Sequence, residues 1–328
     1  MAEKVTISVD ALGGDNAPGV VLEGVQAALE ADPDLSVIIC GPQDVVVPFA
    51  EGRERCEARV TTEVVTMAEH PANAVRKKKD SSLVVGCRLV KEGAAQGFFS
   101  AGSTGACLAA GTLVIGRIKG IMRPALATVV PSPIKPTVLC DVGANADCKP
   151  EYLVQFANMA SVYAKKMLGV DKPRIGLLNI GEEETKGSQF AQDVHALMRE
   201  QVPGFAGNAE GRDVMSGAFD VVVTDGFTGN VCLKTVEGTA KVLFGALKGI
   251  MMKSSVTKLG ALTMKGGLSD LKHTIDPDAF GGAPLLGVKG ACIVGHGSSN
   301  ARAVKNGVLT AAAIVRLGIC DIIAEGQE

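Results

Sequence analysis

The sequence has no tryptophan, only two tyrosines and no excess of one charge, since 33 Lys and Arg residues nearly balance 35 Asp and Glu residues. Proteins that bind nucleic acids generally carry a basic surface, so we expect no nucleic-acid partner for this chain. The nine cysteines are scattered and form no CxxC pair. Their pattern excludes a disulfide scaffold and a zinc ribbon, favours a reducing compartment and predicts no metal site.

No secretory signal precedes the first strand-like run, Lys4–Val9, so we expect a cytoplasmic protein. The stretch over residues 93–116 is uncharged, but it contains six glycines and several polar residues. This composition predicts a strand, a loop and a helix rather than a helix that spans a membrane.

Glycine is abundant, with 40 residues among 328. Short β-branched runs alternate with longer helical patterns, which is typical of βαβ units and a mainly parallel sheet. No linker or repeat divides the chain, so we expect one α/β domain over residues 1–328. The clearest predicted strands are Val5–Val9, Ser36–Cys40, Gly97–Ser100, Thr137–Cys140, Arg174–Leu178, Asp220–Thr224 and Ala291–Val294. The clearest predicted helices are Val20–Glu30, Ser82–Lys91, Glu151–Leu168 and Ala301–Leu317.

Residues 233–273 form a basic amphipathic segment, in which seven lysines between Leu233 and Lys272 face only two acidic residues. Apolar residues in its first half follow the spacing of a helix packed against other helices, and Leu259, Leu262, Leu268 and Leu271 continue the pattern after Ser254. The segment predicts a helical hairpin. It is either packed on the domain or at a dimer seam, or it presents a basic surface to an anionic membrane or an acidic carrier protein.

Six predicted strands end in small, polar loops that contain glycine. In a parallel sheet the carboxyl ends of the strands meet at one edge, where ligands bind. Glycine allows close approach of backbone to a ligand, and the helix N-termini beyond such loops offer free N–H groups to anions. A single loop of this kind is usually just a capped turn, but six predict a binding edge. The loops are residues 10–15, 101–105, 141–145, 179–182, 225–230 and 295–300.

None of these loops matches a nucleotide-binding fingerprint. There is no GxGxxG motif, no Walker A motif and no GxSxG elbow. The pattern therefore favours a phosphate or carboxylate ligand. Arg76, Lys79 and Lys186 are candidate cations for it, although residues 76–79 also suit a solvated helix end. His296 is the one histidine in a strand-end loop, where a structural role and a catalytic role are equally compatible with the sequence.

The ordered series DALGGDNAP, KKDSS, SAGSTGA, CDVGAN, NIGEEETKG, TDGFTGN, FGGAPLLG and GHGSS resembles the bacterial phosphate acyltransferases of phospholipid synthesis. The resemblance runs from Asp10 to the last helix. One departure is Leu12, where the family usually has methionine, a swap that conserves volume.

The resemblance implies a three-layer α/β/α fold similar to that of phosphotransacetylases and of isocitrate and isopropylmalate dehydrogenases. It also implies a homodimer that needs no cofactor and that transfers a fatty acyl group from acyl carrier protein to inorganic phosphate. The acyl phosphate product would feed a membrane-bound glycerol-3-phosphate acyltransferase. Family members are cytoplasmic or associate peripherally with an anionic membrane.

Residue type and loop position, rather than the resemblance, assign the roles in this reaction. Phosphate is itself a nucleophile, so the site must bind a dianion, stabilise an oxyanion and release a thiolate. The predicted catalytic residues are Lys186, Asn145, Asn179 and His296. The predicted substrate-binding residues are Asp10, Gly13, Gly14, Asp15, Arg76, Lys79, Ser103, Thr104, Gly105, Gly181 and Asn230. Residues 280–286 are either a wall for the acyl chain or ordinary core.

Three other functions remain open at this point. A phosphotransacylase that uses coenzyme A would share the fold and the chemistry. A dehydrogenase of the related fold would need an arginine cluster and metal-binding aspartates, whereas Asp10, Asp15, Asp141 and Asp225 are more simply explained as loop caps. A non-catalytic membrane scaffold would leave the six polar loops without a role.

Overall fold

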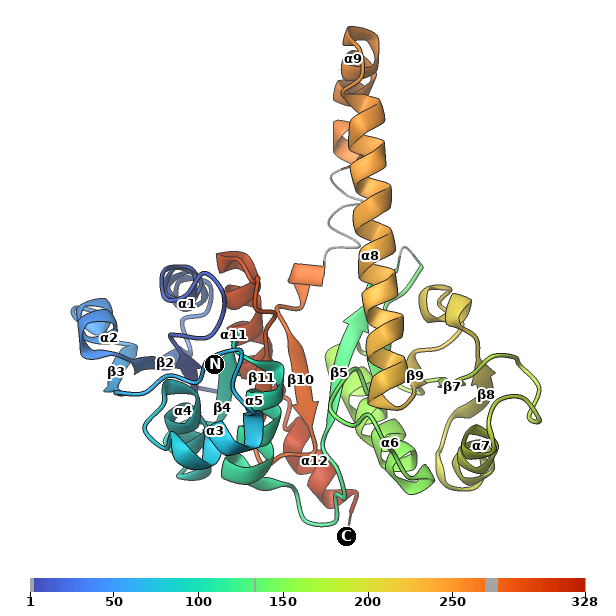
Figure 1. The fold of residues 1–328 in the computed structure, drawn as a ribbon, viewed down its shortest axis with the longest axis horizontal. Helices are drawn as coiled ribbons and strands as arrows, with labels where there is room; N and C mark the ends of the chain where they lie inside the picture. The colour runs from blue at the N-terminus through green and yellow to red at the C-terminus, as the bar shows by residue number, and fades with distance from the viewer. Residues whose placement is uncertain (1–2, 133, 269–276, 328) are drawn as a thin grey trace.

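The computed structural model describes residues 3–132, 134–268 and 277–327. In this part of the chain, eleven strands form one sheet with helices on both faces (Figure 1). The strands are β1 (Val5–Asp10), β2 (Leu35–Gly41), β3 (Cys56–Val60), β4 (Gly97–Ser100), β5 (Ala125–Val130), β6 (Thr137–Cys140), β7 (Ile175–Leu178), β8 (Phe205–Ala209), β9 (Val221–Val223), β10 (Ala283–Leu286) and β11 (Ala291–Val294).

The helices lie mostly between consecutive strands, as the alternating pattern predicts. They are α1 (Gly19–Ala31), α2 (Gln43–Ala50), α3 (Pro71–Lys77), α4 (Ser82–Lys91), α5 (Thr104–Ala110), α6 (Pro150–Met167), α7 (Gln189–Gln201), α8 (Gly226–Met251), α9 (Ser255–Thr263), α11 (Ala301–Arg316) and α12 (Ile319–Glu325). A π-helical stretch, Gly111–Gly116, continues α5, and short 3-10 turns cover Gly211–Met215 and Pro277–Ala279.

Two apolar cores, one on each face of the sheet, confirm the predicted three-layer α/β/α architecture. Because successive strand residues point to opposite faces, the adjacent residues Phe98 and Phe99 enter different cores, and both are fully buried. Helices α1, α6, α7, α11 and α12 cover one face, and α3, α4, α5 and the base of α8 cover the other. Residues 283–286 form a central strand whose Leu285 and Leu286 are core, so this part of the segment is not a wall for an acyl chain.

The strand order is β3-β2-β1-β4-β11-β10-β5-β6-β9-β7-β8. Most neighbours are parallel, but β10 is antiparallel to β11 and to β5, and β5 is antiparallel to β6. Strands β6, β7, β8 and β9 therefore run opposite to β1, β2, β3, β4 and β11. The prediction that the six glycine-containing loops share one edge is wrong, because three follow each set of strands.

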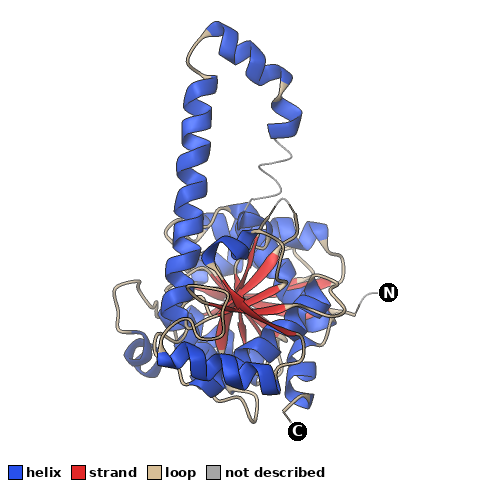
Figure 2. Cartoon of the chain, turned by 90° about the vertical axis from the view of Figure 1, so that its right-hand side faces the viewer, coloured by secondary structure: helices blue, strands red, loops and turns tan. Residues whose placement is uncertain are grey.

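Sheet twist partly compensates for this reversal. Neighbouring strands rotate by about 20–25°, which adds up to roughly 140–175° over the seven steps from β1 to β7. Figure 2 shows the strands fanning around the long axis of the sheet. The carboxyl ends of β1 and β7, although they lie at opposite edges of the hydrogen-bonded ladder, therefore point in similar directions in space.

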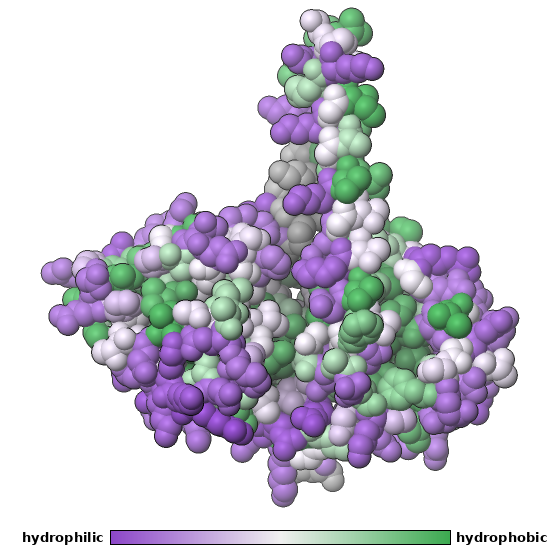
Figure 3. All heavy atoms as spheres, viewed as in Figure 1, coloured by the Kyte–Doolittle hydropathy of each residue, from purple (hydrophilic) through white to green (hydrophobic). Residues whose placement is uncertain are grey.

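Helix α8 rises away from the domain as an arm, with α9 at its tip (Figures 1 and 2). The predicted hairpin begins earlier than residue 233, because Asp225 caps α8 and residues 226–230 are already helical rather than a loop. Beyond the base, the apolar seam does not pack on the domain, since Leu243 is 64% exposed and Ile250 is 63% exposed in the single chain. Packing at a dimer seam and a basic surface for a membrane or carrier protein stay predictions. Hydrophobic residues alternate with charged ones along the arm in Figure 3. Residues 269–276, which include Leu271 and His273, lie outside the described part.

Within the described ranges, no single helix is long and apolar enough to cross a membrane. Only the bent pair formed by α11 and α12 meets the criteria of length and composition.

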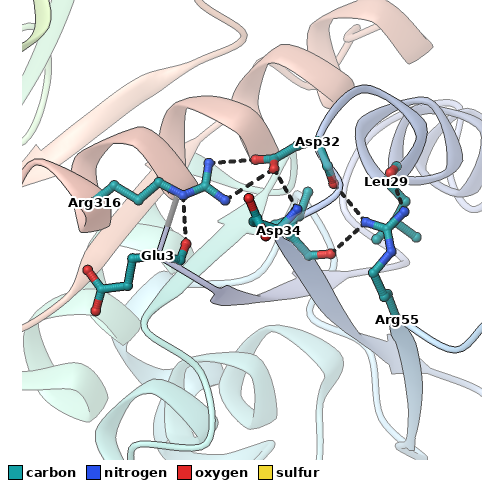
Figure 4. Close-up of polar contacts among 7 residues, drawn as sticks. Glu3, Leu29, Asp32, Asp34, Arg55 and Arg316 are labelled. Carbon is teal, nitrogen blue, oxygen red and sulfur yellow. Dashed lines mark hydrogen bonds and ion pairs between the residues drawn. The ribbon is translucent and has the colours of Figure 1, made fainter. Parts of the chain in front are cut away.

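A largely buried ion pair between Arg316 and Asp32 joins the C-terminal ends of α1 and α11 (Figure 4). The Arg316 guanidinium donates to both Asp32 carboxylate oxygens at 2.6 and 3.2 Å, and to the Glu3 carbonyl oxygen at 3.0 Å. Arg55 donates to the carbonyl oxygens of Leu29, Asp32 and Leu35, which fixes the turn that leads into β2. Partial burial alone would raise the pKa of Asp32, but hydrogen bonds from Arg316 and from the Asp34 N–H outweigh it, so this pKa is lowered.

We expect Asp32→Asn to lower the free energy of unfolding at pH 7 by about 1.5–3 kcal/mol, the usual contribution of a hydrogen bond to a charged group. Because the native pKa of Asp32 is lowered, its stabilisation is complete above the ordinary pKa of 3.8 and is lost as the pH falls through the native value. Urea denaturation of both proteins between pH 7 and pH 3 measures this.

The matched control is Asp34→Asn, because the Asp34 carboxylate forms no hydrogen bond with any described residue. If Asp32→Asn and Asp34→Asn denature with the same pH dependence, the ion pair does not stabilise the junction.

Candidate functional site

The loops after β1, β4 and β11 come together at one edge of the sheet, and we call residues 10–15, 100–105 and 295–300 the first loop cluster. The Asp15 N–H donates to the Gly297 carbonyl oxygen at 2.7 Å. A side chain at Gly14 would place its Cβ 3.2 Å from the same oxygen, and Gly14 has a φ of 113°. The loops pack against α1 and α11 without leaving room for a water molecule, and the residues that meet there are Gly13, Gly14, Asn16, Ala17, Val20, Val21, Ala101, Gly297, Ser299 and Val304.

Asp10 is buried beneath this cluster and does not face solvent. Its carboxylate accepts hydrogen bonds from the Ser100 hydroxyl at 2.8 Å and from the Leu12 N–H at 3.1 Å. Burial raises its pKa, while hydrogen bonds from Ser82, Ser100 and the Leu12 N–H act in the opposite direction. Asp10, predicted to bind substrate, therefore supports the loops from below.

The N-terminus of α5 supplies unpaired hydrogen-bond donors at the surface of the cluster. Ser103 occupies the N-cap position, but its hydroxyl makes no capping bond. The N–H groups of Thr104 and Gly105 lie in the first helical turn, where no intrahelical acceptor exists, and no other described residue accepts from them. Two backbone donors and a hydroxyl from adjacent residues can bind an anion without a cationic side chain.

Helix α3 packs with its first residue against this N-terminus, and the basic run lies at the opposite end of α3. A side chain at Gly105 would place its Cβ 2.6 Å from Pro71, the first residue of α3. Arg76 and Lys79 are exposed and form no ion pair among the described residues. Lys78, between them, instead braces the preceding loop by donating to Glu69 at 2.8 Å and to the Val64 carbonyl oxygen at 2.7 Å.

His296 is exposed in the loop after β11. Its Nδ1 lies 2.8 Å from the Ser298 hydroxyl and accepts the Ser298 N–H at 3.2 Å. With Nδ1 used as an acceptor, the neutral ring carries its proton on Nε2, which has no partner among the described residues. Asp15, also exposed, lies beside the same loop, within 3.5 Å of the Cβ position at Gly297.

The segments that follow the parallel strands β6, β7 and β9 form a second loop cluster, which comprises residues 141–147, residues 179–187 and the N-cap and first turn of α8, residues 225–230. The first of these segments is built on Asp141. The fully buried Asp141 carboxylate accepts from the N–H groups of Leu126, Gly143, Ala144 and Asn145 and from the Asn145 side chain, at 2.7–3.2 Å. Burial raises the pKa of Asp141, and the donors from Ala144 and Asn145 act against this shift. Asp141 is thus a loop cap, as its position after a strand suggests.

Two of the predicted catalytic residues are engaged in holding this cluster together. The Asn145 amide donates to Asp141 at 2.9 Å and to the Pro124 carbonyl oxygen at 2.8 Å. The Asn179 amide donates to the Lys186 carbonyl oxygen at 3.2 Å, and its oxygen accepts the Ile180 N–H at 2.8 Å. Both N–H groups of the Asn145 side chain are engaged, so Asn145 serves its loop. Asn179 uses one of its two N–H groups within its own loop, and the second has no acceptor among the described residues.

Lys186 is exposed above the second cluster. Its ammonium lies 3.9 Å from the Glu183 carboxylate, a distant pair between exposed side chains. Gly181 makes room for its aliphatic stem, because a Cβ there would lie 2.9 Å from the Lys186 Cγ. Asn230, exposed on the first turns of α8, lies near Gly143. Lys186 is therefore the one cationic side chain in the residues that define this cluster, and its only ion pair is the distant one with Glu183.

No hydrogen bond or ion pair between described residues joins the two loop clusters. The first presents free N–H groups, a hydroxyl and an imidazole, and the second presents a lysine and an amide. No group of three or more metal-ligating side chains occurs in the described ranges. Burial raises the pKa of Cys107, the thiol nearest the first cluster, to about 12, so it is protonated at neutral pH. The free N–H groups and the hydroxyl of the first cluster suit an anion.

The sequence analysis missed Ser100 and Lys78. Ser100 ends the apolar run Gly97–Ser100, and a hydroxyl at the buried end of a strand signals a polar partner there. Lys78 is indistinguishable by sequence from the solvated cations that flank it.

The fold of the chain is similar to that of the phosphotransacylases. A phosphotransacetylase from Streptococcus pyogenes superimposes with a TM-score of 0.60 and 17% identity, covering 95% of this chain and 94% of its own. A branched-chain phosphotransacylase from Enterococcus faecalis V583 gives a TM-score of 0.59 and 16% identity, with 94% and 99% coverage. These similarities confirm the predicted fold class.

Sequence similarity is more specific. Residues 5–322 match the family model described as fatty acid synthesis protein, and the chain belongs to this family. A phosphate acyltransferase from Desulfitobacterium hafniense (strain Y51) is 49% identical over 321 residues, which cover 97% of this chain and 96% of the relative. A phosphate acyltransferase from Lysinibacillus sphaericus is 46% identical over 320 residues, with 97% coverage of both. The predicted family resemblance is confirmed.

We expect Gly13→Ala to lower the free energy of unfolding by about 1–3 kcal/mol through overpacking. The new Cβ would lie 2.6 Å from the Ser100 hydroxyl and 2.8 Å from the Gly102 backbone nitrogen, which cannot swing away. The φ of Gly13 is not in the left-handed region, so the loss would reflect contact alone.

Gly19→Ala, at the start of α1, is the control because no atom lies within 4 Å of its added Cβ. Urea denaturation should separate the two variants. Equal stability of both would show that the first cluster is not closely packed.

Proposed function

We propose that this chain transfers a fatty acyl group from acyl carrier protein to inorganic phosphate and thereby forms an acyl phosphate. The observation that carries the proposal is the set of unpaired donors at the N-terminus of α5, beside the glycine loop after β1. Membership in a family whose relatives are named phosphate acyltransferases supplies the reaction.

In this proposal, phosphate binds to the N–H groups of Gly14, Thr104 and Gly105 and to the Ser103 hydroxyl. Gly13 contributes by leaving room for the loops to approach. Such preorganised dipoles bind a dianion without large reorganisation. Arg76 and Lys79, exposed at the end of α3, raise the local phosphate concentration rather than bind it directly.

One phosphate oxygen attacks the thioester carbon, and the carbonyl oxygen becomes the oxyanion of a tetrahedral intermediate. Collapse of the intermediate breaks the carbon–sulfur bond, and the carrier leaves as a thiolate that takes up a proton. We assign the oxyanion to Lys186 and the proton to His296, which as an imidazolium gives up its Nε2 proton and becomes a neutral ring. Asn145 and Asn179, expected to be catalytic from the sequence, are here assigned to loop support.

The arm is proposed to meet an anionic partner. Lys241 and Lys248 are exposed and form no ion pair with described residues, whereas Lys234 pairs with Glu237 at 2.8 Å. The exposed apolar residues beside them suit the surface of an anionic membrane, with the chain peripherally attached and near a glycerol-3-phosphate acyltransferase. Acyl carrier protein, which is acidic, and a second copy of this chain in a homodimer are the further proposed partners.

The test is incubation of the purified protein with long-chain acyl carrier protein, with and without phosphate. We expect free carrier and hydroxylamine-reactive acyl phosphate to appear only when phosphate is present. Acyl-coenzyme A is tested in parallel. Release only from coenzyme A would replace the proposed donor, and release from neither would contradict acyl transfer.

We expect Lys186→Ala to lower kcat by roughly 10²–10³, the usual cost of removing one oxyanion donor. The melting temperature should stay within about 1 °C of wild type, because an exposed ion pair contributes little stability. The control is Lys172→Ala, an exposed lysine in the turn before β7. Equal turnover of the Lys186 and Lys172 variants would remove Lys186 from the mechanism.

We expect the double substitution Leu243→Ser and Ile250→Ser to weaken binding to vesicles of anionic lipid at least about tenfold, because each side chain loses its apolar transfer free energy. Sedimentation with vesicles measures this, and Leu113→Ser, 51% exposed on the π-helical stretch, is the control. Unchanged sedimentation of the double variant would rule out the arm as the membrane contact.

A further inference from the structure

Ser100 is fully buried at the carboxyl end of β4, where two loops of the first cluster meet. Its hydroxyl donates to the Asp10 carboxylate at 2.8 Å and accepts the Gly102 N–H at 3.0 Å. This one oxygen therefore fixes the backbone of Gly102, the residue immediately before Ser103. The orientation of Gly102 sets the direction in which the first turn of α5 points.

The Asp10 carboxylate fixes the neighbouring loop in the same way. One of its oxygens accepts the Leu12 N–H at 3.1 Å, and the other accepts the Ser100 hydroxyl. The loop after β1 and the loop after β4 are thus both hydrogen-bonded to a single buried carboxylate. A change at either hydrogen bond moves one loop relative to the other.

The loops after β1 and β4 lie so close together that a small shift of either one changes their contact. The Cβ position at Gly13 lies 2.6 Å from the Ser100 hydroxyl, 2.8 Å from the Gly102 nitrogen and 3.0 Å from the Ala101 nitrogen. The backbone of the loop after β1 therefore lies directly against the Ser100 hydroxyl and the backbone of the loop after β4. Packed interiors of this kind tolerate little displacement.

We infer that Ser100, held by Asp10, is a positioning residue for inorganic phosphate: it sets the distance between the glycine loop after β1 and the donors of α5. This inference rests on the proposed function and adds residues that do not themselves contact substrate. Phosphate binding requires both sets of donors at once, so a shift of one loop weakens binding of phosphate but not of the acyl carrier. A misplacement of about 1 Å can cost up to roughly 10²-fold in rate.

The test compares Ser100→Ala with Ser8→Ala. Ser8 is equally buried on the adjacent strand β1, and its hydroxyl donates to the carbonyl oxygens of Gly86 and Gly97 at 2.9 and 3.1 Å, away from both loops. For Ser100→Ala we expect kcat/KM for phosphate to fall at least roughly tenfold, while KM for acyl carrier protein stays within about twofold. Ser8→Ala should leave kcat/KM for phosphate unchanged, although both variants lose a buried hydroxyl.

A second readout does not depend on turnover. Calorimetric titration with inorganic phosphate should show weaker binding to Ser100→Ala, and to Asp10→Asn, than to wild type and Ser8→Ala. Equal phosphate affinity in Ser100→Ala and Ser8→Ala, or an equal loss of carrier and phosphate affinity, would overturn the positioning role. A wild-type protein that binds phosphate but transfers no acyl group would instead contradict the proposed function and leave the binding comparison interpretable.

Discussion

The antiparallel strands β10 and β5, inserted at the centre of the sheet, determine the arrangement of everything else. They reverse the chain direction between the strands on one side and those on the other, and so divide the strand-end loops into two clusters. The twist of the sheet then turns the reversed strands back toward the direction of the first set. The reversal of strand direction separates the first loop cluster, which carries the free N–H groups, from the second, which carries Lys186. The twist of the sheet opposes this separation.

Each half of the sheet builds its loops on a buried aspartate at the end of a strand. Asp10 holds the first cluster through Ser100 and the Leu12 N–H, and Asp141 holds the second through Leu126, residues 143–144 and Asn145. Burial raises the pKa of both carboxyl groups, and hydrogen-bond donors offset this shift. The small residues above them allow the backbone to fold tightly over the carboxylate, which leaves other N–H groups free to face solvent.

The sequence was sufficient for the layers and for seven of the eleven strands, but not for β3, β5, β8 and β10 or for the direction of the strands. Buried runs such as Val5–Asp10 and Ala291–Val294 are defined by local hydrophobicity, whereas β5 is antiparallel because of pairings with residues far away in the chain. The roles of short polar residues were equally nonlocal. Ser103 and Asn145 both follow a strand, but only the structure shows that the Ser103 hydroxyl makes no capping bond while the Asn145 amide is used twice.

The glycines of α8 have a consequence for how the molecule comes apart. Gly229 lies against the backbone of Asp141, but Gly238, Gly245 and Gly249 have no atom within 4 Å of an added Cβ. Each glycine in an unpacked helix costs about 0.5–1 kcal/mol relative to alanine, and among the described residues of the outer arm the packing of α8 against the short helix α9 does little to offset this. We therefore expect the arm to unfold as a separate cooperative unit. Its amide hydrogens should exchange through local opening, whereas those of the sheet should exchange only through global unfolding. Binding of a partner to the arm would therefore be detected first as slower amide hydrogen exchange in α8 and α9.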